Sequence, residues 1–208
     1  MTTTIGIKYK DGVILAADRQ VSSENFVASR YGEKIYQLDK KIGVTIAGLV
    51  ADAINLVERL QAEFKLYFFN KNRPISIEAA SQLASKIFYE MFRGGRPFLT
   101  QILMGGFSDD NKPKLYVIDP SGGKIEEEFI STGSGSQIAY GTLENGYKKG
   151  LTENYAIKLS LEAINASVIR NPYTGGKPEI AIISKNGFKK LNEKELKTII
   201  EEVNSHVS

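Results

Sequence analysis

The spacing of apolar residues in the first fifty positions predicts short strands. Alternating or wholly apolar runs cover residues 2–9, 13–17, 26–28, 34–38 and 42–49. Asp11 and Gly12 stand between the first two runs, and an Asp-Gly pair suits the tight turn of a hairpin. The last run is almost entirely apolar, as expected of a strand buried on both faces. The chain therefore begins with a β-sheet.

From position 50 the apolar residues recur every three or four positions, which predicts two amphipathic helices. The first covers residues 50–70, and its apolar stripe consists of Val50, Ile54, Val57, Leu60, Phe64 and Tyr67. The second follows Pro74 and has Ser76 as its N-cap. Its inner face consists of Ala80, Leu83, Ile87 and Met91.

The second half of the chain repeats this order of strands and helices. Strands are predicted at 99–106, 114–119, 126–131 and 179–184, and helices at 136–149, 152–167 and 193–203. Thr152 is the expected N-cap of the second of these helices, with Ile157, Leu161, Ile164 and Val168 spaced for burial. Asn192 and Glu195 are spaced like a capping box.

This element order favours an α/β (α+β) fold. Two antiparallel sheets packed face to face, with pairs of helices outside, would bury every apolar stripe. The 208 residues, of which 42% are hydrophobic, fit one domain spanning residues 1–208.

Composition excludes most routes to hydrolysis. There is no cysteine, so thiolate nucleophiles and cysteine zinc sites are excluded, and we expect neither a metal nor another cofactor. The only histidine, His206, lies near the C-terminus, where a general base of a Ser-His-Asp triad would be poorly held. The net charge of +3 does not favour nucleic acid. Without a signal peptide or an apolar run of ~20 residues, we expect a cytoplasmic protein with no membrane contact.

Thr2 is a candidate nucleophile. If Met1 were removed, Thr2 would carry both a hydroxyl and a free α-amine, and an α-amine of pKa ~8 is a suitable base near neutral pH. The alternative is that Thr2, Thr3 and Thr4 only open a β-strand, for which threonine is well suited.

Asp18 and Lys34 are charged residues at the ends of apolar strands. Each by itself is typical of a surface charge. Beside an N-terminal threonine, however, the Lys34 ammonium would lower the pKa of the hydroxyl and the Asp18 carboxylate would hold the ammonium in place.

Two glycine-containing turns have both a structural and a functional interpretation. Gly48 ends a strand, and its N–H either only permits the turn into the next helix or stabilises an oxyanion there. Residues 133–136 read GSGS between a strand and a helix. A phosphate cradle is disfavoured, because there is no Walker lysine and no complete Gly-x-Gly-x-x-Gly.

Six segments together carry a resemblance to a known family. Residues 2–7, 11–19, 34–37, 47–53, 132–136 and 140–141 read TTTIGI, DGVILAADR, KIYQ, AGLVADA, TGSGS and YG. In order and spacing they resemble the β subunit of the archaeal 20S proteasome over nearly the whole chain. The resemblance implies the N-terminal-nucleophile hydrolase fold, a four-layer α/β/β/α sandwich, and threonine-type hydrolysis of peptides after Met1 is removed.

The resemblance also implies roles for single residues. It makes Thr2 the nucleophile, Asp18 and Lys34 its charged partners, Gly48 the oxyanion donor and Ser134 a neighbour of the threonine amine. It further implies a substrate pocket that favours hydrophobic residues, lined by Val21, Ser22, Gly32, Tyr36, Ile46, Val50 and Ile54.

The chain departs from the family pattern at three positions. Asn171 and Thr174 stand where the motif Arg-Asp-x-x-Ser-Gly has its aspartate and serine, and Gln20 stands where an arginine is usual. Thr174 keeps a hydroxyl, whereas Asn171 and Gln20 carry no charge. We still count Asn171 and Thr174 among the catalytic residues.

The partners that the resemblance implies are other β subunits in a heptameric ring, rings of α subunits, an ATPase regulator reached through the α rings, and unfolded polypeptides. One alternative is a structural β-type subunit with a weak or inactive site. A second is the simpler bacterial relative of the proteasome, against which the helix at 193–203 argues. The third is an ordinary nucleotide-binding α/β domain.

Overall fold

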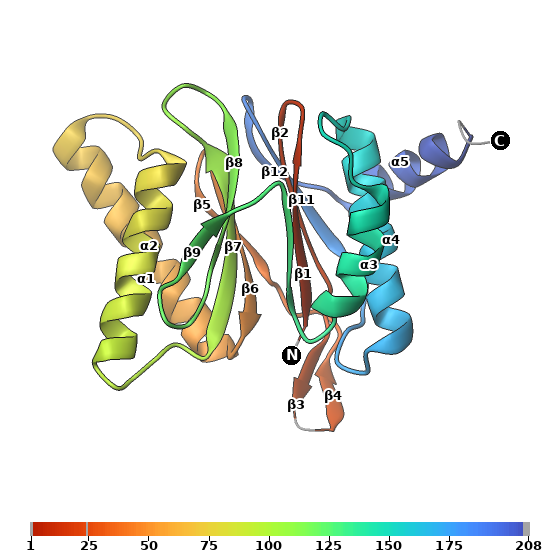
Figure 1. The fold of residues 1–208 in the computed structure, drawn as a ribbon, viewed down its shortest axis with the longest axis horizontal. Coiled ribbons are helices and arrows are strands. Elements are labelled where there is room, and N and C mark those ends of the chain that lie inside the picture. Colours follow the sequence, from red (N-terminus) through yellow and green to blue (C-terminus); the bar gives the residue numbers. More distant parts are fainter. Residues whose placement is uncertain (1, 24, 206–208) are drawn as a thin grey trace.

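In a computed structural model, which describes residues 2–23 and 25–205, the chain forms four layers (Figure 1). Two five-stranded antiparallel sheets face each other, with strand orders β10-β1-β2-β11-β12 and β5-β6-β7-β8-β9. The first sheet consists of β1 (Thr3–Tyr9), β2 (Gly12–Ala17), β10 (Phe129–Gly133), β11 (Glu179–Ser184) and β12 (Gly187–Lys190). The second consists of β5 (Ile35–Asp39), β6 (Ile42–Gly48), β7 (Thr100–Phe107), β8 (Pro113–Ile118) and β9 (Lys124–Glu126).

Helices cover the outer face of each sheet. The helices α1 (Val50–Lys71) and α2 (Ile77–Arg93) lie on the second sheet, whereas α3 (Ser136–Gly146) and α4 (Glu153–Arg170) lie on the first. The last helix, α5 (Glu193–Ser205), packs beside α4. A small ribbon of β3 (Val21–Ser23) and β4 (Phe26–Ser29) projects from the end where β1 begins. The predicted sandwich of two antiparallel sheets between helix pairs is confirmed.

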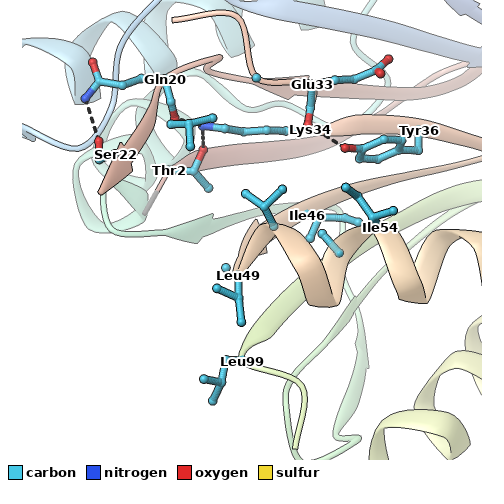
Figure 2. Close-up of a pocket in the computed structure, with 15 residues that line it drawn as sticks. Thr2, Gln20, Ser22, Glu33, Lys34, Tyr36, Ile46, Leu49, Ile54 and Leu99 are labelled. Carbon is cyan, nitrogen blue, oxygen red and sulfur yellow. Dashed lines mark hydrogen bonds between the residues drawn. The ribbon is translucent and has the colours of Figure 1, made fainter. Parts of the chain in front are cut away.

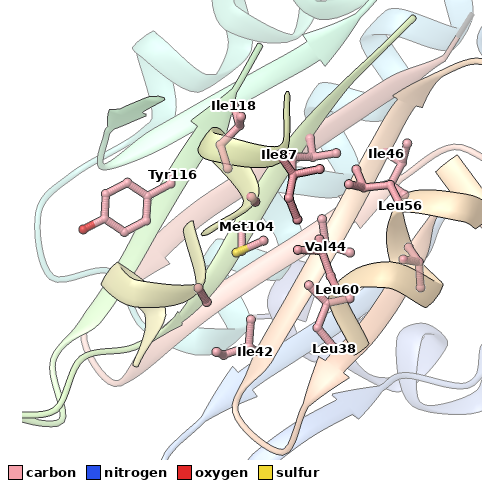
Figure 3. Close-up of a cluster of buried hydrophobic side chains, with 14 of the residues drawn as sticks. Leu38, Ile42, Val44, Ile46, Leu56, Leu60, Ile87, Met104, Tyr116 and Ile118 are labelled. Atoms are coloured by element: carbon pink, nitrogen blue, oxygen red, sulfur yellow. The ribbon is translucent and has the colours of Figure 1, made fainter. Parts of the chain in front are cut away.

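Three apolar clusters hold these layers together. Val13, Leu15, Ile35, Leu103 and Leu115 are among the fully buried residues between the two sheets. A second cluster joins α1 and α2 to their sheet (Figure 3); it includes Val44, Ile46, Leu56, Leu60, Ile87 and Met104. A third joins α3 and α4 to the other sheet, with Ile5, Ile7, Ile14, Ile157 and Ile164. Because a central strand contributes to two clusters at once, its sequence is apolar throughout rather than alternating.

The local signals at the helix ends are confirmed. Ser76 Oγ accepts a hydrogen bond from Ala79 N at 3.4 Å, and Thr152 Oγ1 accepts one from Tyr155 N at 3.4 Å. Asn192 Oδ1 accepts from Glu195 N at 3.0 Å while Glu195 Oε2 accepts from Asn192 N at 2.8 Å, which completes the capping box. The Asp11-Gly12 hairpin also forms, with Tyr9 opposite Gly12.

The strand predicted at 126–131 is wrong, because the chain changes sheets there. Glu127 N donates to Leu115 O of β8 at 3.1 Å, whereas Glu128 O accepts from Lys8 N of β1 at 2.8 Å. The predicted strand is therefore divided between β9, which ends at Glu126, and β10, which begins at Phe129. The short strands β3 and β12 were not predicted, the helix at 136–149 ends earlier, at Gly146, and Val168 is 40% exposed rather than buried.

No helix in the part of the chain that the structure describes combines the length and apolar character needed to span a bilayer. His206 and Met1 lie outside the described residues.

Candidate active site

Thr2 lies just before β1, at the end of the sandwich where the two sheets bring their charged residues together. Its side chain is 2% exposed. Thr2 Oγ1 donates a hydrogen bond to the Asp18 carboxylate and accepts one from the Lys34 ammonium. The structure thus brings together the three residues that the sequence singled out from separate segments.

Asp18 is fully buried at the end of β2 and is surrounded by donors. Its Oδ1 accepts from Thr3 N at 2.9 Å and from Lys34 Nζ at 2.7 Å, in addition to the Thr2 hydroxyl. Its Oδ2 accepts from Gln20 N at 3.1 Å and Gly175 N at 2.9 Å. This number of donors compensates for the cost of burying a carboxylate.

Lys34 uses all three of its ammonium protons. Its Nζ donates to Asp18 Oδ1 at 2.7 Å, to Gln20 O at 2.7 Å and to Thr2 Oγ1. Burial lowers the pKa of Lys34, and the Asp18 carboxylate raises it in opposition, with a smaller contribution from Glu179. A cation in direct contact with the hydroxyl favours the ionised form of that hydroxyl.

Gly48 is the last residue of β6 and lies on the same cavity as Thr2 and Lys34. Its φ of +151° belongs to the region that side chains rarely adopt, and a Cβ added there would collide with Leu99 O. A glycine is therefore required at this turn into α1. The position is compatible with an oxyanion donor, since no side chain separates the backbone from the cavity.

Ser134, Asn171 and Thr174 form a hydrogen-bonded group behind Thr2. Ser134 Oγ lies 3.4 Å from Thr2 O and 3.1 Å from Asn171 Oδ1. Thr174 Oγ1 lies 3.2 Å from Asn171 Oδ1 and 2.7 Å from Thr3 Oγ1. Asn171 Nδ2 also donates to Ser134 O at 2.9 Å, a bond that an aspartate at this position has no proton to make. The amide thus fits its surroundings, and so does the hydroxyl of Thr174.

Gln20 is buried, and its side-chain nitrogen has two neutral hydrogen-bond partners. Its Nε2 donates to Pro172 O at 2.9 Å and Ser22 Oγ at 3.1 Å. Gln20, which stands where the family usually has an arginine, therefore links β3 to the loop that carries Asn171 and Thr174.

A cavity of about 570 Å³ opens beside Thr2 and Lys34 (Figure 2). All the residues that the resemblance assigned to a substrate pocket line it: Val21, Ser22, Gly32, Tyr36, Ile46, Val50 and Ile54. Gln20, Glu33, Leu49, Ala53 and Leu99 line it as well and were not predicted there. Leu49 could have been predicted at the cavity, because it directly follows Gly48 in the sequence. Leu99 lies at the cavity only because β7 pairs with β6.

The wall of this cavity is mostly apolar. Val50, Ile54 and Leu99 are about half exposed or more, at 50%, 46% and 65%. Glu33 faces the cavity with its backbone, because its O accepts from Tyr36 OH at 2.8 Å while its carboxylate points away (Figure 2). That carboxylate pairs with Lys190. Lys34 is then the one charged side chain directed at the cavity among the described residues that line it.

Glu179, at the start of β11, is a further buried carboxylate that sequence reasoning missed. Its Oε1 accepts from Lys34 N at 2.6 Å and from Ile35 N at 3.0 Å. Burial raises the pKa of Glu179, and these backbone donors and the Lys190 ammonium act against that rise. The available signal was the one used for Asp18, a charge at the end of an apolar strand.

Among residues 2–23 and 25–205, no three side chains of His, Cys, Asp or Glu converge as a metal site requires.

The chain is similar to known proteins over nearly its whole length. A family model described as proteasome subunit matches residues 1–183. Proteasome subunit beta of Methanothermobacter thermautotrophicus is 42% identical over 204 residues, which cover 98% of this chain and 96% of the relative. Proteasome subunit beta 2 of Nitrosopumilus maritimus is 43% identical over 200 residues, covering 96% and 94%. Proteasome subunit beta of Methanopyrus kandleri is 40% identical over 200 residues, covering 96% and 95%.

Proposed function

Since this chain belongs to the proteasome family, as a β-type subunit that assembles with other proteasome subunits in a barrel, we propose that it is the threonine endopeptidase of that barrel. Thr2 is the proposed nucleophile. The observation that carries the proposal is the arrangement around Thr2 Oγ1, which contacts both the Lys34 ammonium and the Asp18 carboxylate. A threonine that only opened a strand would need neither charge, and burying both is costly.

In the proposed reaction, removal of Met1 frees the α-amine of Thr2. The hydroxyl oxygen attacks the peptide carbonyl carbon, and its proton passes to the amine, directly or through a water molecule. The amine then returns that proton to the leaving nitrogen as the peptide bond breaks. Water attacks the resulting ester, the acid product leaves, and the hydroxyl is restored.

The surrounding residues have distinct parts in this proposal. Lys34 stabilises the developing alkoxide, and Asp18 holds Lys34. Gly48 N–H stabilises the oxyanion of the tetrahedral intermediate. Ser134, Asn171 and Thr174 orient the segment that carries the amine.

We further propose that the cavity beside Thr2 receives the residue that precedes the cleaved bond. An apolar wall leaves a charged side chain without a partner, so hydrophobic residues are preferred. The substrates are unfolded polypeptides, and the subunit lies in a heptameric β ring next to α rings, through which an ATPase regulator delivers them.

The test compares reconstituted particles that contain wild type, Thr2→Ala and Thr2→Ser. We expect Thr2→Ala to assemble and to lose peptide hydrolysis, since the chain has no cysteine and its one histidine, His206, lies near the C-terminus, and Thr2→Ser to keep part of the activity. Turnover of fluorogenic peptides is the measurement, with native electrophoresis as the control for assembly. Appreciable turnover by Thr2→Ala contradicts the proposal.

The alternative is a structural β-type subunit, and the departures at Asn171 and Gln20 are the observations in its favour. N-terminal sequencing of the assembled particle discriminates the two. Threonine as the first residue supports the peptidase, and a retained methionine supports the structural subunit.

A further inference from the structure

Glu179 is a buried carboxylate for which the proposed mechanism has no use. Its side chain is 11% exposed, and it begins β11, where it lies opposite Ala17 of β2. Its Oε1 accepts hydrogen bonds from Lys34 N and Ile35 N, at 2.6 and 3.0 Å. Lys34 and Ile35 lie at the start of β5, in the opposite sheet. Glu179 therefore joins the two sheets at the end of the sandwich that carries Thr2.

These bonds fix the backbone of Lys34 from one side, and β6 fixes it from the other. Lys34 O accepts from Ile46 N at 3.0 Å, so the residue is held by one sheet through its N–H and by the other through its carbonyl. The position of the Lys34 backbone sets the reach of its side chain toward Asp18 and Thr2. Without Glu179, two buried N–H groups would also lose their acceptor, which is unfavourable.

The second oxygen of Glu179 is also compensated. Its Oε2 lies 3.6 Å from Nζ of Lys190 on β12, and Lys190 pairs with Glu33 as well. The carboxylate thus has acceptor contacts on one oxygen and a cation near the other. Such a fully partnered group is held in one orientation, as a group that positions its neighbour must be.

We propose that Glu179 is a positioning residue for the peptidase reaction: by holding the backbone of Lys34, it places the ammonium against the Thr2 hydroxyl. The inference rests on the proposed function. It assigns the importance of Glu179 to the geometry of its acceptor oxygen rather than to its charge.

Three substitutions separate geometry from charge in the reconstituted particle. Glu179→Ala removes the acceptor, Glu179→Gln keeps an acceptor oxygen without the charge, and Glu179→Asp keeps the charge on a shorter side chain. We expect Glu179→Ala to lower kcat by about 100-fold with little change in KM, because a misplacement of about 1 Å has that effect. Glu179→Gln should recover most of this loss, and Glu179→Asp should recover less than Glu179→Gln.

A matched control is Glu128→Ala. Glu128 is also a partly buried carboxylate with bonded partners, since it accepts from Lys8 Nζ at 2.7 Å and from Tyr147 OH at 2.9 Å. It contacts neither Lys34 nor Asp18. We expect this variant to lose thermal stability and to keep kcat, so that a general loss of packing is distinguished from mispositioning.

The outcomes separate the inference from the function on which it rests. Turnover by Thr2→Ala overturns the proposed function. With wild type active and Thr2→Ala inactive, a wild-type kcat in Glu179→Ala overturns the inference alone, and so does an equal loss in Glu179→Gln and Glu179→Ala.

A structure of the Glu179→Ala particle tests the inference independently of activity. We expect Lys34 Nζ to leave its 2.7 Å contact with Asp18 Oδ1. An unchanged contact overturns the inference. If Glu179→Ala does not assemble, the kcat values of Glu179→Gln and Glu179→Asp test the inference instead. A higher kcat in Glu179→Asp than in Glu179→Gln overturns the inference.

Discussion

At the scale of single residues, the site is a balance between burial and pairing. Lys34 is nearly buried, which disfavours its charged form, and its ammonium is kept beside the hydroxyl by Asp18. Asp18 in turn depends on backbone donors from Thr3, Gln20 and Gly175. Removing the side chain of either Lys34 or Asp18 leaves the other charge uncompensated in the interior, so these two residues act as a unit.

The pH dependence of hydrolysis should report on Lys34. Its pKa lies below the ordinary value of 10.5 because burial outweighs the opposing effect of Asp18. A lysine with a lowered pKa keeps its proton at low pH and loses it as the pH rises through that lowered value. We therefore expect kcat to fall on the basic side before pH 10.5, in a titration in which light scattering confirms that the particle stays intact.

The control for this titration is Lys34→Arg, because arginine does not deprotonate in this range. Whatever activity the variant keeps should lack the basic limb. A basic limb at the same pH in both proteins would assign it to another group and contradict the prediction.

A second pH prediction concerns Asn171. In Asn171→Asp, a carboxylate oxygen replaces the Nδ2 group that donates to Ser134 O, and a negative charge enters the group of hydroxyls behind Thr2. A nearby anion stabilises the ammonium form of the Thr2 amine, so a higher pH is needed to free the base. The acid limb of the rate profile should move upward, by about 0.5 unit or more. Superimposable profiles, with Met1 removal checked in both proteins, would make position 171 purely structural.

Residue chemistry was partly predictable from the sequence. Asp18 and Lys34 could be singled out because each is a charged residue at the end of an apolar run. Thr2 could be singled out because removal of Met1 would give it a free α-amine. Glu179 shows the same pattern and was missed, because nothing in the sequence says that β11 lies beside β2 and faces the entry to β5. The pairing of distant segments is a tertiary property that single-sequence patterns do not contain.

At the scale of elements, the predictions that rest on the clearest local sequence signals are confirmed. The wrong strand prediction occurs where a segment passes from one sheet to the other. Capping by Ser76 and Thr152 depends on neighbouring residues alone, so it was predictable. The division of residues 126–131 between β9 and β10 depends on which sheet supplies each partner, so it was not. β12 was missed because Lys189 and Lys190 are typical of a solvated surface, although they pair with β11.

A prediction at the scale of elements concerns the junction of β6 and α1. Gly48→Ala places a Cβ against Leu99 O at a positive φ, which strains the turn by ~1–3 kcal/mol and displaces the backbone beside Thr2. We expect kcat to fall by about 100-fold or more, as for loss of an oxyanion donor, together with a lower melting temperature. Peptide turnover and a thermal melt of the assembled particle are the measurements.

Gly150→Ala is the matched control for this variant. Gly150 has a φ of +83° but open space where a Cβ would be, so alanine introduces backbone strain without a collision. It should cost ~1 kcal/mol of stability and leave kcat unchanged. Equal effects of the two variants on kcat would show that the loss at Gly48 reflects stability and not the site.

At the scale of the whole molecule, the sandwich places the site where its two sheets end together. Thr2 and Asp18 come from one sheet, Lys34 and Gly48 from the other, and α1 closes the cavity with Val50 and Ile54. These two α1 residues belong to the apolar stripe that predicts the helix, yet they are about half exposed and face the cavity. Periodicity alone does not tell a core position from a pocket position, and here the family resemblance supplied the distinction.

The last prediction tests whether this apolar wall sets specificity. Ile54 lines the cavity from α1, and Ile54→Glu would place a carboxylate in its wall. Among the described residues that line the cavity, Lys34 is the charged side chain directed inward, and Asp18 already pairs with it. A carboxylate in the wall would pair with the Arg guanidinium, so we expect kcat/KM for cleavage after Arg, relative to Leu, to rise by about tenfold or more. Ile54→Gln, of equal size without charge, should leave the preference for Leu in place. Unchanged preferences in Ile54→Glu, measured with matched fluorogenic peptides in particles of equal active-site content, would show that this cavity does not receive the residue before the cleaved bond.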